Sequence, residues 1–183
     1  MNRNDAAPSD DAVVRTERLW LRHILPADAP VMYAMNADPE VLRYTGDEPF
    51  HDVREARSFI AAYPDYRLHG FGRWAVVRTE DGAVLGWCGL KRHGDGQVDL
   101  GYRLLRSAWG RGYATEASKA CLEWGFQEAG LDTIIGRVAR ANTASIRVLE
   151  KVGMRFWKEQ ACAGIQDALV YRLDREGPLS ARP

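Results

Sequence analysis

The chain has 183 residues with 25 basic and 25 acidic side chains, so it carries no net charge at neutral pH. This balance does not favour nucleic acid or an anionic membrane as a partner, and no run approaches the roughly 18 apolar residues of a membrane span. The three cysteines, Cys88, Cys121 and Cys162, are far apart and form no CxxC or Cys/His pattern, so neither disulfides nor a metal site are expected. The polar N-terminus lacks an apolar signal segment, and together these features predict a cytoplasmic protein.

The charges are unevenly distributed along the chain. Between Asn36 and Glu55 six acidic residues stand against two arginines, whereas between Arg103 and Lys158 ten basic residues stand against five acids. An acidic first third and a basic second half suit an enzyme that binds a cationic acceptor and a phosphorylated donor. Solvated surface charge explains the same pattern equally well.

The N-terminal part of the chain predicts one strand followed by two helices. Residues 1–13 are polar and are expected to form a disordered arm. Residues 16–23 are predicted to form a strand, because Leu19 and Leu21 alternate with Trp20 and Arg22. A helix is predicted from Pro26 to about Ala37, and after a short helical turn a second helix runs from Val53 to Tyr63, with Asp52 placed to cap it.

The rest of the chain predicts an antiparallel run of strands, then a crossover, then two closing strands. Strands are predicted at residues 72–78, 83–92, 97–105, 133–138, 155–160 and 166–173, and helices at 114–129 and 142–151. Residues 174–183 read as a flexible tail. The fold class is therefore α/β, a mixed and mostly antiparallel sheet of about seven strands flanked by helices, in the order β-α-α-β-β-β-α-β-α-β-β. Residues 14–173 are predicted to form a single domain.

The clearest chemical signal runs from Trp109 to Thr115, where a strand and a glycine-bearing turn lead into a long helix. The first N–H groups of a helix have no internal partner, and the helix dipole adds about half a positive charge there. Gly110 and Gly112 let the backbone approach a phosphate without an intervening Cβ. The spacing fits neither a Walker loop nor the dinucleotide-binding fingerprint. We therefore predict a phosphate or diphosphate site. The simpler alternative is that the two glycines only allow the chain to turn.

Three segments carry a family resemblance. Residues 110–117 (GRGYATEA) resemble the acetyl-CoA motif of the GNAT N-acetyltransferases, residues 100–102 resemble the strand before that motif, and residues 142–154 resemble the second cofactor motif. With residues 16–22, the chain is similar to the branch that contains the ribosomal-protein N-terminal acetyltransferases (RimJ/RimL type). The resemblance implies the GNAT fold, acetyl-CoA as cosubstrate and an amine acceptor.

The resemblance also assigns residues to the cosubstrate. Backbone N–H groups after the strand would hold the pyrophosphate, the end of the strand would line the pantetheine arm, and Asn142 would contact that arm or cap its helix. The set is Leu104, Leu105, Trp109, Gly110, Arg111, Gly112, Tyr113, Ala114, Thr115 and Asn142. A backbone N–H on the strand would polarise the thioester carbonyl. Ser107 stands where the motif has Gln or Arg, which matters little where the backbone does the binding.

Two residues are expected to transfer protons. Many GNAT enzymes carry a tyrosine where Leu149 stands, and the resemblance implies that Ser145 protonates the leaving thiolate instead; a packing or capping hydroxyl is the alternative. Asp99, on the central strand, is the candidate for the carboxylate that accepts the proton of the amine. The alternatives are a water relay, which can suffice because an α-amine needs little help to lose its proton, and an exposed strand carboxylate without a catalytic role. His93 lies in a turn and is expected to be exposed to solvent.

The acceptor is left open by the sequence. We expect direct transfer of the acetyl group to a primary amine, which is a protein N-terminal α-amine in one interpretation. The alternatives are a small amine (an amino acid, polyamine or antibiotic) and, from a different class, a non-catalytic CoA-binding module. By resemblance, the two N-terminal helices would bind the acceptor beside their aromatic side chains, and the branch often forms homodimers, although no residue here indicates one.

Overall fold

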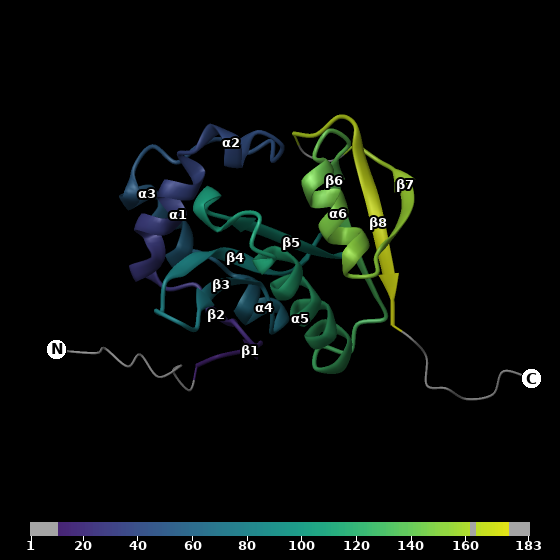
Figure 1. Ribbon diagram of the computed structural model, residues 1–183, viewed down its shortest axis with the longest axis horizontal. Coiled ribbons are helices and arrows are strands. Elements are labelled where there is room, and N and C mark those ends of the chain that lie inside the picture. The colour runs from purple at the N-terminus through teal and green to yellow at the C-terminus, as the bar shows by residue number, and fades with distance from the viewer. Residues whose placement is uncertain (1–10, 162–163, 176–183) are drawn as a thin grey trace, which may run out of the picture.

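The computed structural model describes residues 11–161 and 164–175 of the chain. Within them, one sheet has the strand order β1-β2-β3-β4-β5-β6-β8-β7 (Figure 1). Its strands are β1 (Val14–Arg15), β2 (Leu19–His23), β3 (Arg73–Arg78), β4 (Val84–Arg92), β5 (Val98–Leu104), β6 (Thr133–Ala139), β7 (Arg155–Glu159) and β8 (Ala168–Asp174). The helices are α1 (Ala29–Asn36), α2 (Pro39–Leu42), α3 (Val53–Ala61), α4 (Asp65–His69), α5 (Tyr113–Gln127) and α6 (Thr143–Lys151), with short 3-10 turns at Pro26–Asp28 and Arg106–Ala108.

The predicted fold class is confirmed, and the structure adds two short elements. Strand β1 is additional to the seven predicted strands. It pairs with β2 through two residues only and is too short to leave a sequence pattern. Helix α4 follows Pro64, just past the end of the second predicted helix, and ends at Gly70, whose φ of 75° suits a helix C-terminus. The predicted cap of α3 is present, because the Asp52 side chain accepts from the Glu55 N–H.

Backbone pairing includes residues on either side of the predicted 14–173 range. Val13, placed in the N-terminal arm, donates its N–H to Leu21. Asp174, placed in the tail, is the last residue of β8, and Arg175 donates its N–H to Asp132. Strand pairing extends order past the point where the apolar alternation stops. The remainder of both predicted segments, residues 1–10 and 176–183, lies outside the described part.

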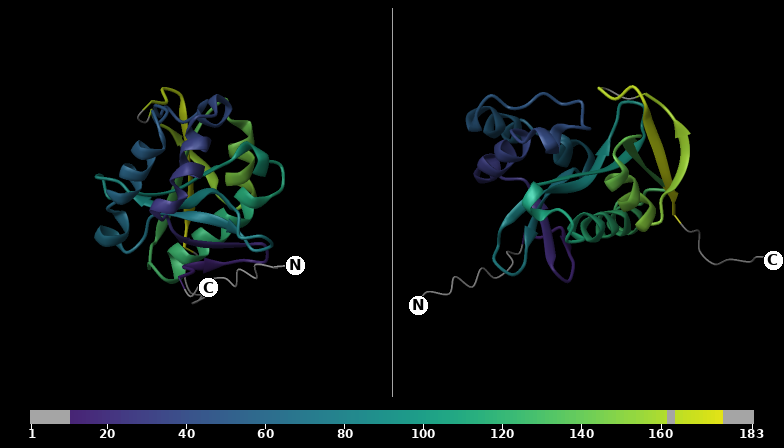
Figure 2. Two further views of the ribbon diagram at one scale, coloured as in Figure 1. Left: turned by 90° about the vertical axis from the view of Figure 1, so that its left-hand side faces the viewer. Right: turned by 45° about the horizontal axis from the view of Figure 1, so that its top comes forward.

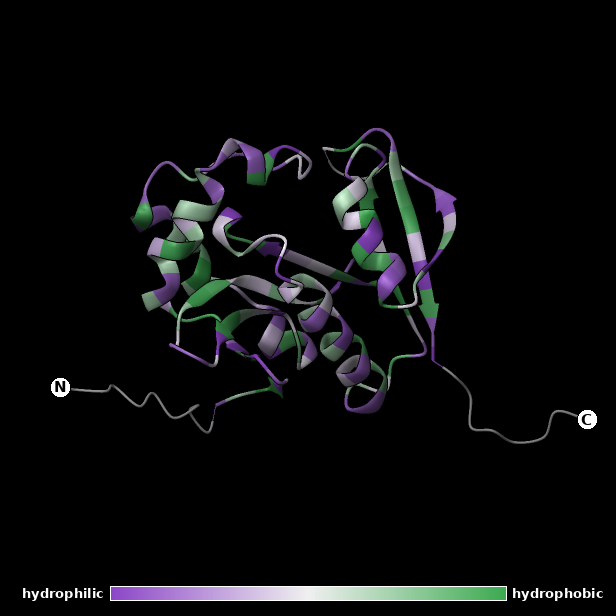
Figure 3. Cartoon of the chain, in the orientation of Figure 1, coloured by the Kyte–Doolittle hydropathy of each residue, from purple (hydrophilic) through white to green (hydrophobic). Residues whose placement is uncertain are grey.

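Helices cover both faces of the sheet (Figure 2). On one face α5 packs against β4 and β5, and the buried side chains of α5, including Ala117 and Cys121, belong to the same apolar cluster as Leu90 and Leu100. On the other face α1 and α3 form a second cluster, which includes Met35. The helices alternate between hydrophobic and hydrophilic segments (Figure 3), as expected of helices that lie on a sheet.

The centre of the sheet is split between β5 and β6. These strands are parallel, as the crossover predicted, but they pair at one position only, Asp99 opposite Ile135. Strand β6 instead pairs along its whole length with β8. Because β5 and β6 separate after Asp99, backbone groups along the edge of β5 no longer face a partner strand there. The split leaves room for ligands at the centre of the sheet, on both of its faces.

Candidate active site

A cavity of about 450 Å³ lies on the α5 face of the split, and we call it the α5–α6 cavity. It is bounded by the end of β5, the turn before α5, the first residues of α5 and one side of α6. Eight of the ten residues that the sequence assigned to the cosubstrate line it: Leu104, Trp109, Gly110, Gly112, Tyr113, Ala114, Thr115 and Asn142. The structure therefore gathers most of the predicted site into one place.

The N-terminus of α5 presents free backbone donors to this cavity. The cap residue Gly112 has a φ of 81° and no side chain caps the helix. Glu116, in the first turn, turns its carboxylate away to accept from the Thr16 hydroxyl and from Arg18. Burial alone would raise the pKa of Glu116, but these hydrogen bonds hold it below the usual value. The first-turn N–H groups thus remain available to a phosphate.

Two predicted residues, Leu105 and Arg111, lie outside the α5–α6 cavity. Leu105 packs against the α1 and α3 cluster, and its N–H donates to the Leu85 carbonyl at 2.8 Å. Side chains alternate along a strand, so the residue after Leu104 faces the opposite side of the sheet. The Arg111 carbonyl accepts from the Arg18 guanidinium at 3.0 Å.

Sequence reasoning missed two cationic residues of this cavity, Arg147 and Lys151. They lie four residues apart on α6, and residues at that spacing share one face of a helix. Once Asn142 is taken as the helix cap, the sequence is therefore sufficient to predict that these two cations share a helix face. Both side chains suit an anionic ligand, and together with the uncapped N-terminus of α5 they make the cavity a fitting site for a phosphorylated cosubstrate.

A second cavity of about 890 Å³ lies on the opposite face of the sheet, and we call it the α1–α3 cavity. The aromatic residues Phe50 and Trp87 line it, as do the acidic residues Asp47 and Glu48. The lining also includes charged or titratable residues from the sheet and the β4–β5 turn, among them Arg73, His93, Asp99 and Arg137. Thr45 and Arg103 line both cavities, so the two meet at the split.

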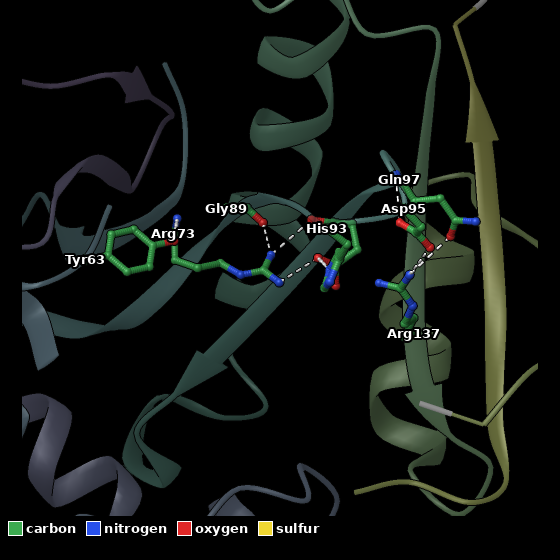
Figure 4. Close-up of polar contacts among 8 residues, drawn as sticks. Tyr63, Arg73, Gly89, His93, Asp95, Gln97 and Arg137 are labelled. Atoms are coloured by element: carbon green, nitrogen blue, oxygen red, sulfur yellow. Dashed lines mark hydrogen bonds and ion pairs between the residues drawn. The ribbon is translucent and has the colours of Figure 1, made fainter. Parts of the chain in front are cut away.

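Asp99 is the centre of a polar network in the α1–α3 cavity. Its partners Arg73 and His93 are shown in Figure 4. Its Oδ1 accepts from Arg73 Nη2 at 3.0 Å and lies 2.8 Å from His93 Nε2. Burial by itself would raise the pKa of Asp99, but the charge of Arg73 and the hydrogen bond with His93 outweigh it and lower that pKa to about 2. Asp99 is only 8% exposed, so the alternative of an exposed strand carboxylate is excluded.

Arg73 reaches Asp99 on β5 with a side chain that crosses one strand, β4. Its N–H donates to the Tyr63 hydroxyl at 2.9 Å, and its guanidinium donates to the carbonyls of Gly89 and Asp99. A Cβ on Gly101 would lie 2.7 Å from the Arg73 guanidinium carbon, so the glycine makes room for this side chain. The network depends on residues that are distant in sequence.

His93 was expected to be solvent-exposed, and the structure corrects that expectation. Its side chain is 34% exposed and lines the α1–α3 cavity. The turn after β4 folds back so that His93 lies beside Asp99, six residues later on the paired strand β5. No periodic pattern in the sequence marks a turn residue that faces inward.

Comparison with known proteins assigns the family. Residues 18–155 match the acetyltransferase (GNAT) domain family. The chain belongs to the GNAT family. An uncharacterized N-acetyltransferase p20 from Bacillus licheniformis is 36% identical over 166 residues, covering 86% of this chain and 93% of that protein. Members of the family use acetyl-CoA, so the chain is an acetyl-CoA-dependent N-acetyltransferase that acts on an amine acceptor.

Solved structures agree with the fold. An acetyltransferase from Agrobacterium tumefaciens has a TM-score of 0.77 at 29% identity, covering 95% of this chain and all of that one. Spermidine N-acetyltransferase from Vibrio cholerae, solved with CoA and spermine, has a TM-score of 0.71 at 16% identity, covering 87% of this chain and 97% of that one. The second likeness concerns the fold alone.

The GNAT assignment draws attention to the hydroxyl groups of the α5–α6 cavity. Ser145 lines the cavity, and its N–H is capped by the Asn142 side chain at 3.1 Å. Leu149, where many family members carry a phenol, is buried against Gly136. The cavity nevertheless has a phenol from a different element, since Tyr102 of β5 lines it. The Tyr102 hydroxyl donates to the Ser145 carbonyl at 3.3 Å. Burial raises the pKa of Tyr102 to about 12, so the group stays protonated at neutral pH.

In residues 11–161 and 164–175, no group of three His, Cys, Asp or Glu side chains could hold a metal ion. No helix of that same part of the chain has the length and apolar character needed to span a membrane.

Proposed function

We propose that this GNAT enzyme transfers the acetyl group directly to a primary amine held in the α1–α3 cavity, while acetyl-CoA occupies the α5–α6 cavity. The observation that carries the proposal is that the two cavities lie on opposite faces of β5 and share Thr45 and Arg103. Two substrates bound there would meet at the split between β5 and β6. Cys88 and Cys121 are buried, which favours transfer without an acyl-cysteine intermediate.

On the donor side, backbone groups would do most of the binding. First-turn N–H groups of α5 would hold the diphosphate, with Arg147 and Lys151 as cationic side chains nearby. Leu104 and Asn142 would contact the pantetheine arm. Acetyl-CoA supplies the thioester, and the free edge of β5 beyond Asp99 offers backbone N–H groups to polarise its carbonyl.

On the acceptor side, we assign proton transfer to His93 and a positioning role to Asp99. A carboxylate with a pKa of about 2 accepts a proton from an ammonium group poorly, which argues against the sequence-based prediction that Asp99 is the base. With Nε2 protonated and donating to Asp99, His93 keeps Nδ1 as an acceptor. The carboxylate then fixes the orientation and tautomer of the imidazole.

Protonation of the leaving thiolate would fall to Ser145, as the resemblance implies. Tyr102 would hold the first turn of α6 in place through its hydrogen bond to the Ser145 carbonyl. Both side chains line the α5–α6 cavity, so both are near the bound thioester in this proposal. A thiol leaves more readily than an amine, so the demand on this acid is modest.

The shape of the α1–α3 cavity favours a small amine over a polypeptide. The loop after α2 and the loop before β8 touch across the cavity, since a Cβ on Gly46 would lie 2.6 Å from the Gly164 Cα. Side chains from both loops, among them Asp47 and Ile165, line the cavity. This contact between the two loops suits an acceptor that is small enough to fit within the cavity of about 890 Å³. The RimJ/RimL-type motifs favour the second candidate, a protein N-terminal α-amine.

The test is a thiol-release assay with a panel of amino acids, polyamines and N-terminal peptides, with product masses measured. We expect small amines to be acetylated, with initial-velocity lines that intersect as a ternary complex requires. Turnover of peptides alone would favour the second candidate. Parallel lines would contradict direct transfer, and an absence of turnover across the panel would contradict the proposed acceptor classes.

A further inference from the structure

Arg137 has an unusual environment in the α1–α3 cavity. Its side chain is only 13% exposed, and Nη2 donates to Gln97 Oε1 at 3.2 Å and lies 3.9 Å from Asp95 Oδ2. Nη1 is buried, and none of the described residues gives it a hydrogen-bond partner. In Figure 4 the guanidinium contacts Asp95 and Gln97 on one side, while its second terminal nitrogen points away from them. A buried N–H of a charged group is costly when it has no partner.

The other unpartnered buried side-chain atoms of the described residues differ from Arg137 in one respect. They are Asp65 Oδ2 and Trp74 Nε1, and neither residue lines either cavity. Arg137 lines the α1–α3 cavity. It is thus the residue among the three whose missing partner a bound ligand could supply.

The charge around Arg137 is also incompletely balanced. The positive charge of Arg137 helps to lower the pKa of Asp99, but the Asp99 carboxylate already contacts Arg73 and His93. Asp95, the nearest acid, is 49% exposed and too far from Arg137 for a close ion pair. Lys91 lines the same cavity and adds a further cation. This end of the cavity therefore suits an anionic group.

The position of Arg137 relates that anionic group to the proposed reaction centre. Ile135 pairs with Asp99 across the split, and Arg137 follows two residues later on β6, with its side chain on the same face. Two residues along a strand span about 7 Å. A short molecule can therefore reach from His93, beside Asp99, to the Arg137 guanidinium.

We infer that Arg137 binds a carboxylate of the acceptor, so that the substrate class is a small amino-carboxylate such as an α-amino acid. This inference rests on the proposed function, because it places the acceptor amine beside His93. Arginine suits the task, since its planar fork pairs with a carboxylate through two parallel hydrogen bonds. The acidic residues Asp47 and Glu48, on the loop after α2, would admit the ammonium group of the same molecule.

The experiment compares kcat/KM for each of the twenty amino acids with that for its C-terminal amide, using the full chain. The amide keeps the amine and side chain and removes the negative charge. We expect the wild type to prefer at least one acid over its amide by about ten- to hundredfold, the range for a hydrogen bond to a charged group. In Arg137→Gln the ratio of kcat/KM for the acid to kcat/KM for the amide should fall toward one, and Arg137→Lys should retain part of the preference.

The matched control is Arg140→Gln, which removes an arginine that follows β6, pairs with Glu159 and lies outside the cavity lining. Its preference for acid over amide should equal that of the wild type. Equal rates on acids and amides in the wild type would overturn the inference while leaving the proposed transfer to amines intact. An unchanged preference in a folded Arg137→Gln protein, judged by its melting temperature, would also overturn it. If no acceptor is turned over, the proposed function itself is contradicted.

Discussion

The two cavities lie on opposite faces of the same strand, and they are built in different ways. The α5–α6 cavity takes much of its wall from one continuous stretch, the end of β5 through the start of α5, and offers backbone groups. The α1–α3 cavity takes its polar groups from side chains far apart in sequence, such as Arg73, Asp99 and Arg137. A site made from backbone should tolerate side-chain change, so Ser107 in place of Gln or Arg is expected to matter little. A site made from side chains can change its substrate by a single substitution.

The largest expected effect concerns the buried network of the α1–α3 cavity. Asp99→Asn leaves the Arg73 guanidinium, itself 13% exposed, without its charged partner. Removing one member of a buried ion pair costs about 3 kcal/mol in the free energy of unfolding, and for a chain of this size the melting temperature should fall by about 10 °C. Asp95→Asn, at a half-exposed site, should change it little. Equal melting temperatures for the wild type and Asp99→Asn would contradict the network.

The same substitution predicts a pH dependence. The folded pKa of Asp99, about 2, lies below the unfolded value. The ionised carboxylate therefore stabilises the fold fully above about pH 4, and this contribution disappears as the pH falls through about 2. Wild-type protein should lose on the order of 2 kcal/mol of unfolding free energy in that window, and Asp99→Asn should lose less. Urea titrations at pH 5, 4, 3 and 2 measure the difference.

The next effect in size tests whether His93 belongs to the chemistry of the α1–α3 cavity. In His93→Gln, kcat should fall about a hundredfold at neutral pH, the lower end for a general base, because an α-amine needs little help to lose its proton. The acetyl-CoA-induced rise in melting temperature should remain, since His93 lies outside the α5–α6 cavity. His69→Gln, in α4, is the matched control. Wild-type rates in His93→Gln would remove the residue from the mechanism.

On the other face, Ser145→Ala should lower kcat by about tenfold, which is modest because a thiolate is a good leaving group. The KM for acetyl-CoA should stay close to that of the wild type. Tyr102→Phe removes the hydrogen bond to the Ser145 carbonyl and should lower kcat by about threefold, the loss of one weak hydrogen bond. Stopped-flow thiol release measures both variants. A larger loss in Tyr102→Phe than in Ser145→Ala would give the acid role to the phenol.

The smallest effect separates backbone binding from fold stability. Gly112→Ala and Gly130→Ala each place a Cβ on a residue with positive φ, 81° and 63° respectively. Each should cost about 1 kcal/mol of unfolding free energy. Only Gly112→Ala should also raise the KM for acetyl-CoA, by about fivefold, because Gly112 caps the helix that lines the α5–α6 cavity. Equal KM values in the two variants would argue against a backbone cradle at Gly112.

Much of the fold was predictable because its signals are local. Strand alternation, the Asp52 and Asn142 caps and the glycines around α5 each act within a few residues, and all of them are present in the structure. What escaped prediction was short or non-local. Strand β1 has two residues, and α4 is a single turn and a half after a proline. Neither is long enough to show a period.

The candidate site divides along the same line. By itself, the sequence located the turn from Trp109 to Thr115 and the cap at Asn142, because consecutive residues build those features. It named Asp99 but assigned it no partners. Only the tertiary structure brought Arg73 across β4 to Asp99, turned His93 toward Asp99 and left Arg137 facing the cavity without a full set of partners. Sheet pairing decides which distant side chains share a face, and no local pattern encodes that choice.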